Sequence, residues 1–592
     1  MATISRPLNR RWSPGWPEWV VLACCLLSIG LGFIESRLNT DALHWGLMYG
    51  NAADMLEGLA PYRQIFIQYG WLTTKIQSLG LLVFGNTVSS VGITTSLFYA
   101  ANIYLSYCLW SKILSRSLAC ASAVLMFLIQ GYIIFPWSNY FSYTFFLASL
   151  LWITASPSSR KNYFFAGLFA GLSLLARQSP LPVLAPIYLH GLWMLINNPE
   201  PHSRRTILED FGLFHIGLSL IWSAFLVHLM QQAAIYDWYQ QSFTISKFYK
   251  EYFLDKNKDL FPKSNLSIAL FIDLISNIVG RLLRPFNIRF TIYSLAFVNS
   301  LIIWIRTADA RQQAGVEPAG CNKNPDLLFL YASVVLLGSL NSMHIYEIFR
   351  LQNASSLGLG LLVYSLNNLA IRFGTLRRPI LQVTALATFG ALISGVVIIN
   401  DGHPQRTRNG YLYHPWNKQL LFRPRPEKPG FPTILRDKWH DDKADTFYLS
   451  LKETLDRYAG CGLTHLINLT DNGVIPYLTD SLETFQRSPL HYQALQDLIF
   501  NDEKKTIAQH IRNGDAVLAL AVDPRRKRAT PVPDHYTVVF RAAPASNSGS
   551  LISGNQFVIA VPRNLACPSG RATWLRPARP AGAGAGAQAS AR

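Results

Sequence analysis

The sequence predicts a polytopic α-helical membrane protein that carries a C-terminal α/β domain. Half of its 592 residues are hydrophobic and only 15% are charged, whereas soluble chains carry about 25% charged residues. Apolar segments long enough to cross a bilayer recur as far as Asn400, and the residues that follow are mixed and polar. We therefore expect a transmembrane domain (1–400), an α/β domain (401–575) and a disordered, low-complexity tail (576–592).

Eleven segments qualify as transmembrane helices. The first apolar run follows Arg10 and Arg11 and lacks a small-residue cleavage site, so we expect a span and not a signal peptide. The other predicted spans lie near 88–110, 117–135, 140–156, 162–177, 181–197, 209–230, 287–305, 327–343, 355–371 and 379–400.

Lysines and arginines gather in every second loop between these segments, which places those loops and the N-terminus in the cytoplasm. The alternation requires that Ser264–Leu283 lies on the outer surface as an amphipathic helix, with Asp273, Asn277 and Arg281 at helical spacing. If this segment spans instead, every later element inverts. With this topology, a loop of about 37–87, a second long loop and all residues after 400 lie outside the cytoplasm.

Outside the cytoplasm no nucleotide pool is expected, so an enzyme working there needs a donor that is carried in the membrane. The sequence contains neither a GxxxxGK[ST] phosphate loop nor a GxGxxG fingerprint, in agreement with this expectation. The formal charge of +19 comes with cations in the inner loops and the tail, which favours contact with anionic lipids over nucleic acid.

The first outer loop carries a recognisable arrangement. It begins with "TDALHWG", continues with "GLAPYRQIFIQYGWLTT" and leads into the second span. This arrangement resembles the GT-C superfamily of polyprenyl-phosphate-sugar-dependent glycosyltransferases, which includes the protein O-mannosyltransferases and the bacterial aminoarabinose transferases. The resemblance covers about residues 15–400. Many members have a second acid nearby, but here Ala42 follows Asp41 and the next outer turn, "FPWSNYFSY", has none. This departure argues against a two-carboxylate or metal-assisted scheme, and a divalent metal remains an unsupported alternative.

The resemblance implies a GT-C-like glycosyltransferase of the bacterial inner membrane with its C-terminal domain in the periplasm. The donor would be a polyprenyl-phosphate sugar, and the acceptor a glycan, a lipid or a protein. No cofactor is certain from the sequence. A transporter or flippase for a lipid-linked glycan and a non-enzymatic envelope scaffold remain alternatives. A transporter is expected to show paired halves with broken helices, and the sequence shows no such repeat.

Asp41 is the predicted catalytic base. Asn39 or Thr40 can cap a helix here and leave Asp41 in its first turn, where the helix dipole favours the ionised carboxylate. The alternative is that Asp41 only starts this helix. Charges near membrane depth are costly, which favours the functional interpretation.

Three further residues of this loop are candidate substrate contacts. His44 lies on the Asp41 face one turn on, either as a catalytic residue or as a hydrogen-bonded interfacial histidine. Arg63 follows a Pro61 turn and either binds a phosphate or packs the loop. Tyr69 either fixes the loop or touches the substrate.

Candidate phosphate ligands lie before a later span, in "NSMHIYEIFRLQNASSLG", where His344, Glu347 and Arg350 are spaced by three and would form one polar stripe on a helix. Arg350 is the leading ligand because its guanidinium can grip two phosphate oxygens at once. The alternative is an ion pair between Glu347 and Arg350. Arg177, at the outer end of a span, either lines the cavity or snorkels to the headgroups.

The residues after 400 mix strand-like runs, such as "AVLALAV", "YTVVFRA" and "NQFVIAVP", with the helical run "FYLSLKETLDRYA", which predicts a small α/β domain. This domain shows no catalytic constellation and would cover the cavity, select the acceptor or bind separately. It contains Cys461 and Cys567, which could form a disulfide in an oxidising compartment.

Overall fold

The computed structural model describes most of the chain, namely residues 15–38, 44–67, 69–130, 136–155, 160–197, 200–244, 266–283, 288–312, 325–342, 348–372, 429–438, 442–470, 472–485, 501–522, 532–542, 556–565, 567 and 573–575. The chain divides into two compact units. The first, here called the helical unit, comprises Met1–Glu35, Ile67–Ile76 and Ile93–Thr407. The second, here called the sheet unit, comprises Ser36–Phe66, Gln77–Gly92 and Arg408–Arg592.

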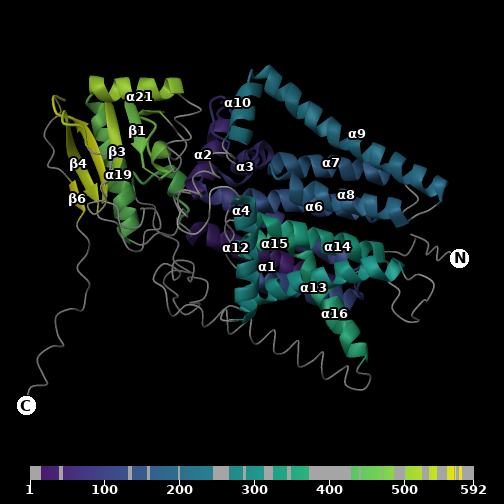
Figure 1. Ribbon diagram of the computed structural model, residues 1–592. Coiled ribbons are helices and arrows are strands. Elements are labelled where there is room, and N and C mark those ends of the chain that lie inside the picture. Colours follow the sequence, from purple (N-terminus) through teal and green to yellow (C-terminus); the bar gives the residue numbers. More distant parts are fainter. Residues whose placement is uncertain are drawn as a thin grey trace, which may run out of the picture. The chain divides into compact units, whose positions relative to one another are not determined.

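Most helices of the first 372 residues follow the predicted segments, whereas α3 and α10 lie within stretches predicted as long loops (Figure 1). They are α1 (Trp16–Leu38), α2 (His44–Leu56), α3 (Trp71–Phe84), α4 (Val88–Trp110), α5 (Arg116–Gln130), α6 (Ser138–Ile153), α7 (Lys161–Ala176), α8 (Pro180–Asn197), α9 (Pro201–Gln231), α10 (Ile235–Tyr239), η1 (Gln240–Thr244), α12 (Leu266–Leu283), α13 (Ile288–Gln312), α14 (Pro325–Gly338), η2 (Ser339–Ser342), α15 (Ile348–Ser355) and α16 (Leu357–Arg372).

Helix α9 begins eight residues before the predicted start of its span, at 201 instead of 209. Pro201 occupies the first turn, where its fixed φ favours a helix and its missing N–H costs nothing. The residues that follow are polar, so the apolar pattern alone marks only the later part of this helix. The predicted amphipathic segment is helical as α12.

Within the described residues, four helices are long and apolar enough to cross a membrane, or up to six if each of two bent helix pairs counts as one span. The bent pairs are α3 with α4, at 113°, and α15 with α16, at 74°. Helices α6 and α7 have only 16 residues each, about 24 Å at 1.5 Å per residue and thus short of a bilayer core of about 30 Å. The predicted count of eleven is therefore not confirmed, and the predicted span at 379–400 lies outside the described residues.

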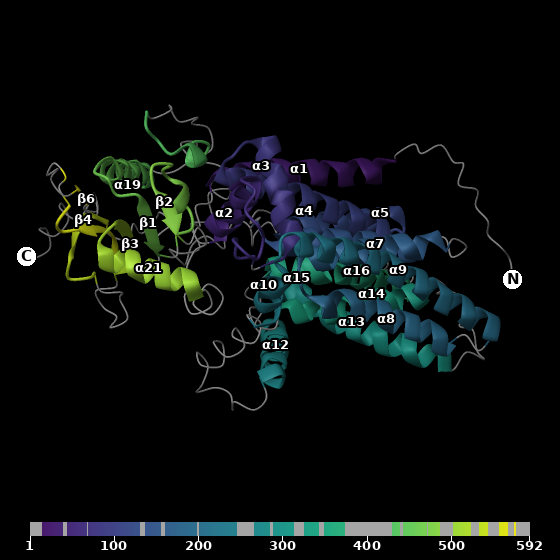
Figure 2. The same ribbon diagram turned by 90° about the horizontal axis from the view of Figure 1, so that it is seen from above.

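In the helical unit, α7 packs against both α6 and α9, and α14 packs against α8, α13 and α16 (Figure 2). Helices α7 and α9 approach backbone to backbone. A Cβ atom added to Gly167 would lie 1.9 Å from the carbonyl oxygen of Phe214, and one added to Gly217 would lie 2.2 Å from that of Phe164. Small residues at such crossings are typical of helices that associate in lipid.

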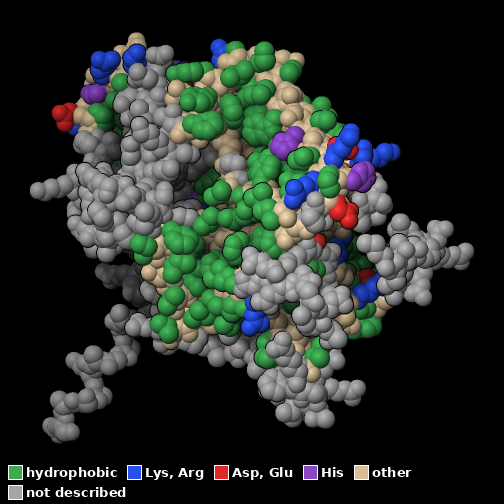
Figure 3. Space-filling model, turned by 45° about the vertical axis from the view of Figure 1, so that its right-hand side comes forward, with side chains coloured by type: hydrophobic (Ala, Val, Ile, Leu, Met, Phe, Trp, Pro, Cys, Tyr) green, Lys and Arg blue, Asp and Glu red, His purple; other side chains and the backbone are tan. Residues whose placement is uncertain are grey.

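Hydrophobic side chains cover much of the described surface in Figure 3, and the charged side chains are few and lie mostly near its margins. The large apolar residues exposed along α9 include Leu208, Ile216, Leu220, Val227 and Met230. Such a surface suits contact with lipid. Together with the apolar helices, it identifies an integral membrane protein.

The described part of the C-terminal region forms one mixed six-stranded sheet in the order β2-β1-β3-β5-β4-β6 (Figure 1). Its elements are η6 (Thr433–Leu435), α19 (Asp442–Gly460), β1 (His465–Leu469), η7 (Ile475–Tyr477), β2 (Glu483–Phe485), α21 (Asn501–Asn513), β3 (Ala516–Val522), β4 (Tyr536–Ala542), β5 (Gln556–Pro562) and β6 (Thr573–Leu575). Strands β1, β2 and β3 are parallel to one another, and β5 runs antiparallel to both β3 and β4. The predicted α/β character of this region is thus confirmed.

Helices cover both faces of this sheet. Ile507 of α21 packs against Leu518 and Leu520 of β3 in one buried cluster, and Phe447 of α19 contacts the rings of Phe540 and Phe557. The structure also joins Cys461 to Cys567 in a disulfide, with the Cα atoms 5.5 Å apart. The disulfide that the sequence left open is therefore present. The predicted tail, 576–592, lies outside the described residues.

Candidate functional site

A pocket lies in the helical unit where α6, the α7–α8 junction, η2 and α15 meet. It holds about 310 Å³ of space outside the protein atoms, solvent included, which is near the lower limit of ordinary ligand pockets, about 300 to 1,000 Å³. Its wall is lined mainly by hydroxyl, amide and aromatic side chains and one guanidinium, from Asn139, Ser142, Tyr143, Phe146, Arg177, Ser179, Pro182, Val183, Asn341, Asn353 and Ala354.

Arg177 is the cation of this wall. It directly follows α7 in an extended conformation, with φ −151° and ψ 123°, so its side chain leaves the helix axis before Pro180 starts α8. Its Nη1 donates to Ser138 Oγ at 3.3 Å and to Asn139 Oδ1, and its Nε donates to Ser179 Oγ at 3.3 Å. These bonds hold the guanidinium at the pocket wall, and its role as a substrate contact stays a prediction.

Arg350 lies close to Arg177 but outside the pocket wall. Its Cζ atom is 5.9 Å from the ring centre of Trp137 and 5.4 Å from that of Phe349, and these two rings are parallel with centres 6.1 Å apart. Tyr69 meets the Trp137 ring edge-on at 4.5 Å. Two predicted substrate contacts, Tyr69 and Arg350, thus meet at Trp137, and a third, Arg177, is near both of them.

The segment that carries Tyr69 is anchored at the end of α7. Thr73 Oγ1 donates to the Ala176 carbonyl at 2.8 Å, next to Arg177, and the Ile67 N–H donates to Gln241 Oε1 at 3.0 Å. These bonds hold Tyr69 and Gly70 beside the end of α7 and Arg177.

The charges around the pocket favour an anion. The guanidinium groups of Arg177 and Arg350 repel each other, with the Tyr69 ring also near, and the described residues of the pocket wall include no carboxylate. The Asn139 side chain is 2% exposed, and among the described residues its Nδ2 has no hydrogen-bond partner. A buried donor left without a partner costs about 1 to 3 kcal/mol. An anion bound here would reduce the repulsion between the two guanidinium groups and would accept a hydrogen bond from Asn139 Nδ2.

The remaining predicted site residues belong to the sheet unit or are not described. His44 is the first residue of α2 and is half-buried, and Arg63 is exposed in the turn between Pro61 and Ile65. Asp41, His344 and Glu347 lie outside the described residues. The catalytic base and the polar stripe therefore stay predictions.

The structure adds residues that the sequence did not single out. Trp137 and Asn139 come from the turn "FPWSN", where a tryptophan and an amide flank a serine at the start of α6. Such polar and aromatic residues are unusual at the end of an apolar segment, and this composition is the feature of the sequence that could have indicated a site. Asn341 and Asn353 are amides near helix ends that belong to no motif, and the packing of η2 and α15 brings them to the pocket.

In the sheet unit, α2 carries the carboxylate of Asp54. Asp54 is 2% exposed and accepts a hydrogen bond of 3.0 Å from the Tyr477 hydroxyl. The Tyr477 ring also meets that of Tyr49 edge-on. Burial raises the pKa of Tyr49, and the carboxylates of Glu57, Asp54 and Asp480 add to this rise. Asp54 thus joins the first outer loop to the C-terminal residues of the same unit and has a structural role.

The fold of this chain is similar to that of the solved structure of ArnT, as expected from the resemblance of residues 38–72 to the GT-C superfamily. The structure of ArnT from Cupriavidus metallidurans bound to undecaprenyl phosphate covers 94% of this chain and 100% of its own, with a TM-score of 0.51 and 11% identity. The oligosaccharyltransferase AglB from Archaeoglobus fulgidus, in complex with an inhibitory peptide and a dolichol-phosphate, covers 93% of this chain and 76% of its own, with a TM-score of 0.46 and 11% identity. No protein-family model and no curated protein matches the sequence.

Proposed function

We propose that this protein is a membrane glycosyltransferase that moves a sugar from a polyprenyl-phosphate donor to an acceptor on the extracytoplasmic side. The observation that carries the proposal is the pair Arg177 and Arg350 beside a pocket with the unmet Nδ2 donor of Asn139. It is supported by the fold shared with ArnT, whose structure holds undecaprenyl phosphate.

The two arginines suit the departing phosphate. When the bond between the sugar and the phosphate breaks, negative charge develops on the phosphate oxygens, and guanidinium groups stabilise it with paired, charge-assisted hydrogen bonds. Arg350 is the proposed principal ligand. Arg177, already held by its three side-chain partners, would bind without large rearrangement, and the Asn139 amide would donate a further bond.

Asp41 is the proposed general base. In this mechanism the acceptor hydroxyl attacks the anomeric carbon, its proton passes to the Asp41 carboxylate, and the polyprenyl phosphate leaves with the electrons of the broken C–O bond. His44, Arg63, Tyr69, His344 and Glu347 are the proposed further substrate contacts, of which Tyr69 is already beside the arginines.

The proposed topology places residues 401–592 in the periplasm of a bacterial inner membrane. The Cys461–Cys567 disulfide supports this location, because such bonds persist in oxidising compartments. A reporter that is active only in the cytoplasm, fused after Asn400, is expected to be silent. Reporter activity would contradict the topology and the argument for a lipid-linked donor.

A transferase and a transporter can be distinguished by what happens to the labelled donor. The purified protein is given a panel of polyprenyl-phosphate sugars, labelled in the sugar, together with envelope glycans, lipids and proteins as acceptors. A transferase releases free polyprenyl phosphate and moves the label to an acceptor, whereas a flippase in vesicles moves the intact labelled lipid between leaflets. Leaflet exchange without release of polyprenyl phosphate from any donor would replace the proposal with the transporter.

A further inference from the structure

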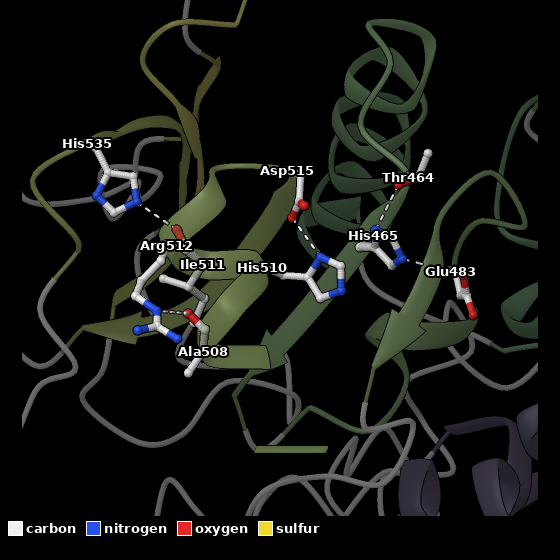
Figure 4. A network of polar contacts seen from close by, with 9 residues as sticks. All are labelled: Thr464, His465, Glu483, Ala508, His510, Ile511, Arg512, Asp515 and His535. Atoms are coloured by element: carbon white, nitrogen blue, oxygen red, sulfur yellow. Dashed lines mark hydrogen bonds and ion pairs between the residues drawn. The ribbon is translucent and has the colours of Figure 1, made fainter. Parts of the chain in front are cut away.

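The parallel part of the sheet brings metal-ligand residues to one edge. His465, Glu483 and Ala516 occupy equivalent positions in β1, β2 and β3, and Asp515 directly precedes Ala516. Because parallel strands start at the same edge of a sheet, these side chains meet although they are distant in the sequence. The His465 Nε2 atom lies 3.6 Å from Glu483 Oε2 (Figure 4).

Helix α21 adds a second histidine to this edge. It ends at Asn513, and the connection to β3 is only Gly514 and Asp515, so the last turn of the helix lies beside the start of the strand. The Nδ1 atom of His510 is 2.8 Å from Asp515 Oδ1, and the His510 and His465 rings have centres 4.4 Å apart (Figure 4).

The cluster has the chemistry of a transition-metal site. One ligand atom each from His465, His510 and Asp515 all lie within 4.8 Å of one another. Imidazole nitrogen and carboxylate oxygen are the donors that zinc accepts, at about 2.0 to 2.2 Å. Ligand atoms around a tetrahedral zinc are then about 3.3 to 3.5 Å apart. Ligand atoms that lie as much as 4.8 Å apart must therefore approach by about 1.3 to 1.5 Å on binding, and the 2.8 Å hydrogen bond between His510 Nδ1 and Asp515 Oδ1 must open if both atoms bind the ion.

The exposure of the four side chains allows this contraction. The two histidines are 19% and 20% exposed and so are held by the sheet and the helix, whereas the carboxylates of Asp515 and Glu483 are 44% and 75% exposed and can rotate toward an ion. The partners already present resemble the support that metal-binding histidines usually have, because Thr464 Oγ1 lies 2.8 Å from His465 Nδ1.

We propose that His465, His510 and Asp515 bind one divalent transition-metal ion of the zinc type, with Glu483 available for the fourth position. The ion would tie the starts of β1, β2 and β3 to the end of α21. It would therefore stabilise the sheet unit, independently of any glycosyl transfer. The competing interpretation is a metal-free polar cluster in which His510 and Asp515 simply share a hydrogen bond.

The test uses the full chain without a polyhistidine tag, purified in detergent and stripped of metal with a chelator. Zinc is titrated calorimetrically, its content is measured by elemental analysis, and thermal unfolding is followed with and without the ion. We expect one zinc per chain and a higher unfolding temperature with zinc, because a ligand of the folded state stabilises it. His465→Gln with His510→Gln should remove both effects.

The matched control is His535→Gln. His535 belongs to the same unit, but its Nε2 donates to the Ile511 carbonyl at 2.7 Å and it is not part of the cluster (Figure 4). This variant should bind zinc as the wild type does. If the double variant does not fold, Asp515→Asn replaces it, because asparagine can still accept the hydrogen bond from His510 but is a poorer metal ligand. Wild-type protein that binds no zinc, or zinc binding unchanged in the folded cluster variants, would overturn the proposal.

Discussion

The helical unit and the sheet unit accommodate their polar side chains differently. In the helical unit polar groups bond to one another between helices, as Asn102 does with Asn353 at 3.0 Å and Gln352 with Tyr99 at 2.7 Å. In the sheet unit the buried cluster between α21 and the sheet is almost entirely apolar, and the histidine cluster lies half-exposed at the edge.

This difference decides which polar residues carry information about function. Lipid offers no hydrogen bonds, so a polar group in the helical unit must find its partner inside the protein. Two neighbouring arginines and an unmet Asn139 donor therefore stand out there. At a solvent-exposed edge of a sheet, a polar residue costs little folding free energy, so its presence alone says little about function. What indicates a site there is the strand register, because it brings two histidines and a carboxylate together.

The largest expected effect comes from Asp41→Asn. Asparagine keeps the size of the side chain and its capping geometry but cannot take a proton, so sugar transfer should fall by about 10²- to 10⁴-fold while the protein remains folded and inserted. Turnover of purified variant and wild type is compared with the donor panel. A rate within about threefold of wild type would remove Asp41 from the role of base.

Asp54→Asn is the matched control for this change. It makes the same substitution in the same outer loop, and asparagine can still accept the hydrogen bond from Tyr477. Because Asp54 has a structural role, turnover should stay close to wild type. If Asp54→Asn loses as much turnover as Asp41→Asn, Asp54 would be a candidate for the catalytic carboxylate, and the loss in Asp41→Asn could not be assigned to a missing base alone.

The second effect concerns the sheet unit, where Cys461→Ser with Cys567→Ser should lower its free energy of unfolding by about 2 to 5 kcal/mol. The bond closes a loop with a sequence separation of 106 residues, and a cross-link over a long loop restricts the unfolded chain strongly. Thermal unfolding is measured with and without reductant, with Cys108→Ser, whose thiol is not in a disulfide, as control. A wild-type unfolding temperature that reductant leaves unchanged would contradict this expectation.

The sequence predicted the elements whose signal is local. Lipid demands long apolar helices, so the segments of α4 to α9 were found within a few residues apart from the polar start of α9, and the apolar runs of β3 and β4 were found in full. Helix α21 was missed because its residues are mostly polar and only Ile507 and Ile511 mark its buried side.

The candidate site was predictable only in part. Arg177 and Arg350 were found because cations beside apolar segments are rare, and Tyr69 because of the loop motif. Asn139 and Trp137 were missed because neither is charged and neither belongs to a motif. The histidine cluster was missed because it depends on the pairing of β1 with β3, and strand pairing across a crossover cannot be read from spacing.

A smaller loss is expected for Arg350→Ala. Hydrogen bonds to charged groups contribute about 1.5 to 3 kcal/mol, which corresponds to about 10- to 100-fold in kcat/KM. Arg350→Lys should recover part of the loss, because lysine keeps the charge but not the paired geometry. Arg281→Ala is the matched control, since the Arg281 guanidinium also lies over an aromatic ring, 4.7 Å from that of Phe290. Equal losses in the two alanine variants would assign Arg350 a packing role only.

The smallest effects test packing in the helical unit with one substitution at two sites. Gly167→Ala should destabilise the protein by about 1 to 3 kcal/mol, the usual cost of overpacking, because the new Cβ would meet the Phe214 carbonyl at 1.9 Å and α7 and α9 would have to separate. Gly212→Ala in α9 places its Cβ where nothing lies within 4 Å, so only the helix propensity of alanine acts, a gain of about 0.5 to 1 kcal/mol. Thermal unfolding in detergent should therefore shift in opposite directions for the two variants. A shift of the same sign and size in both would mean that the close approach of α7 and α9 does not contribute to stability, and that the helical unit is held instead by its polar bonds between helices.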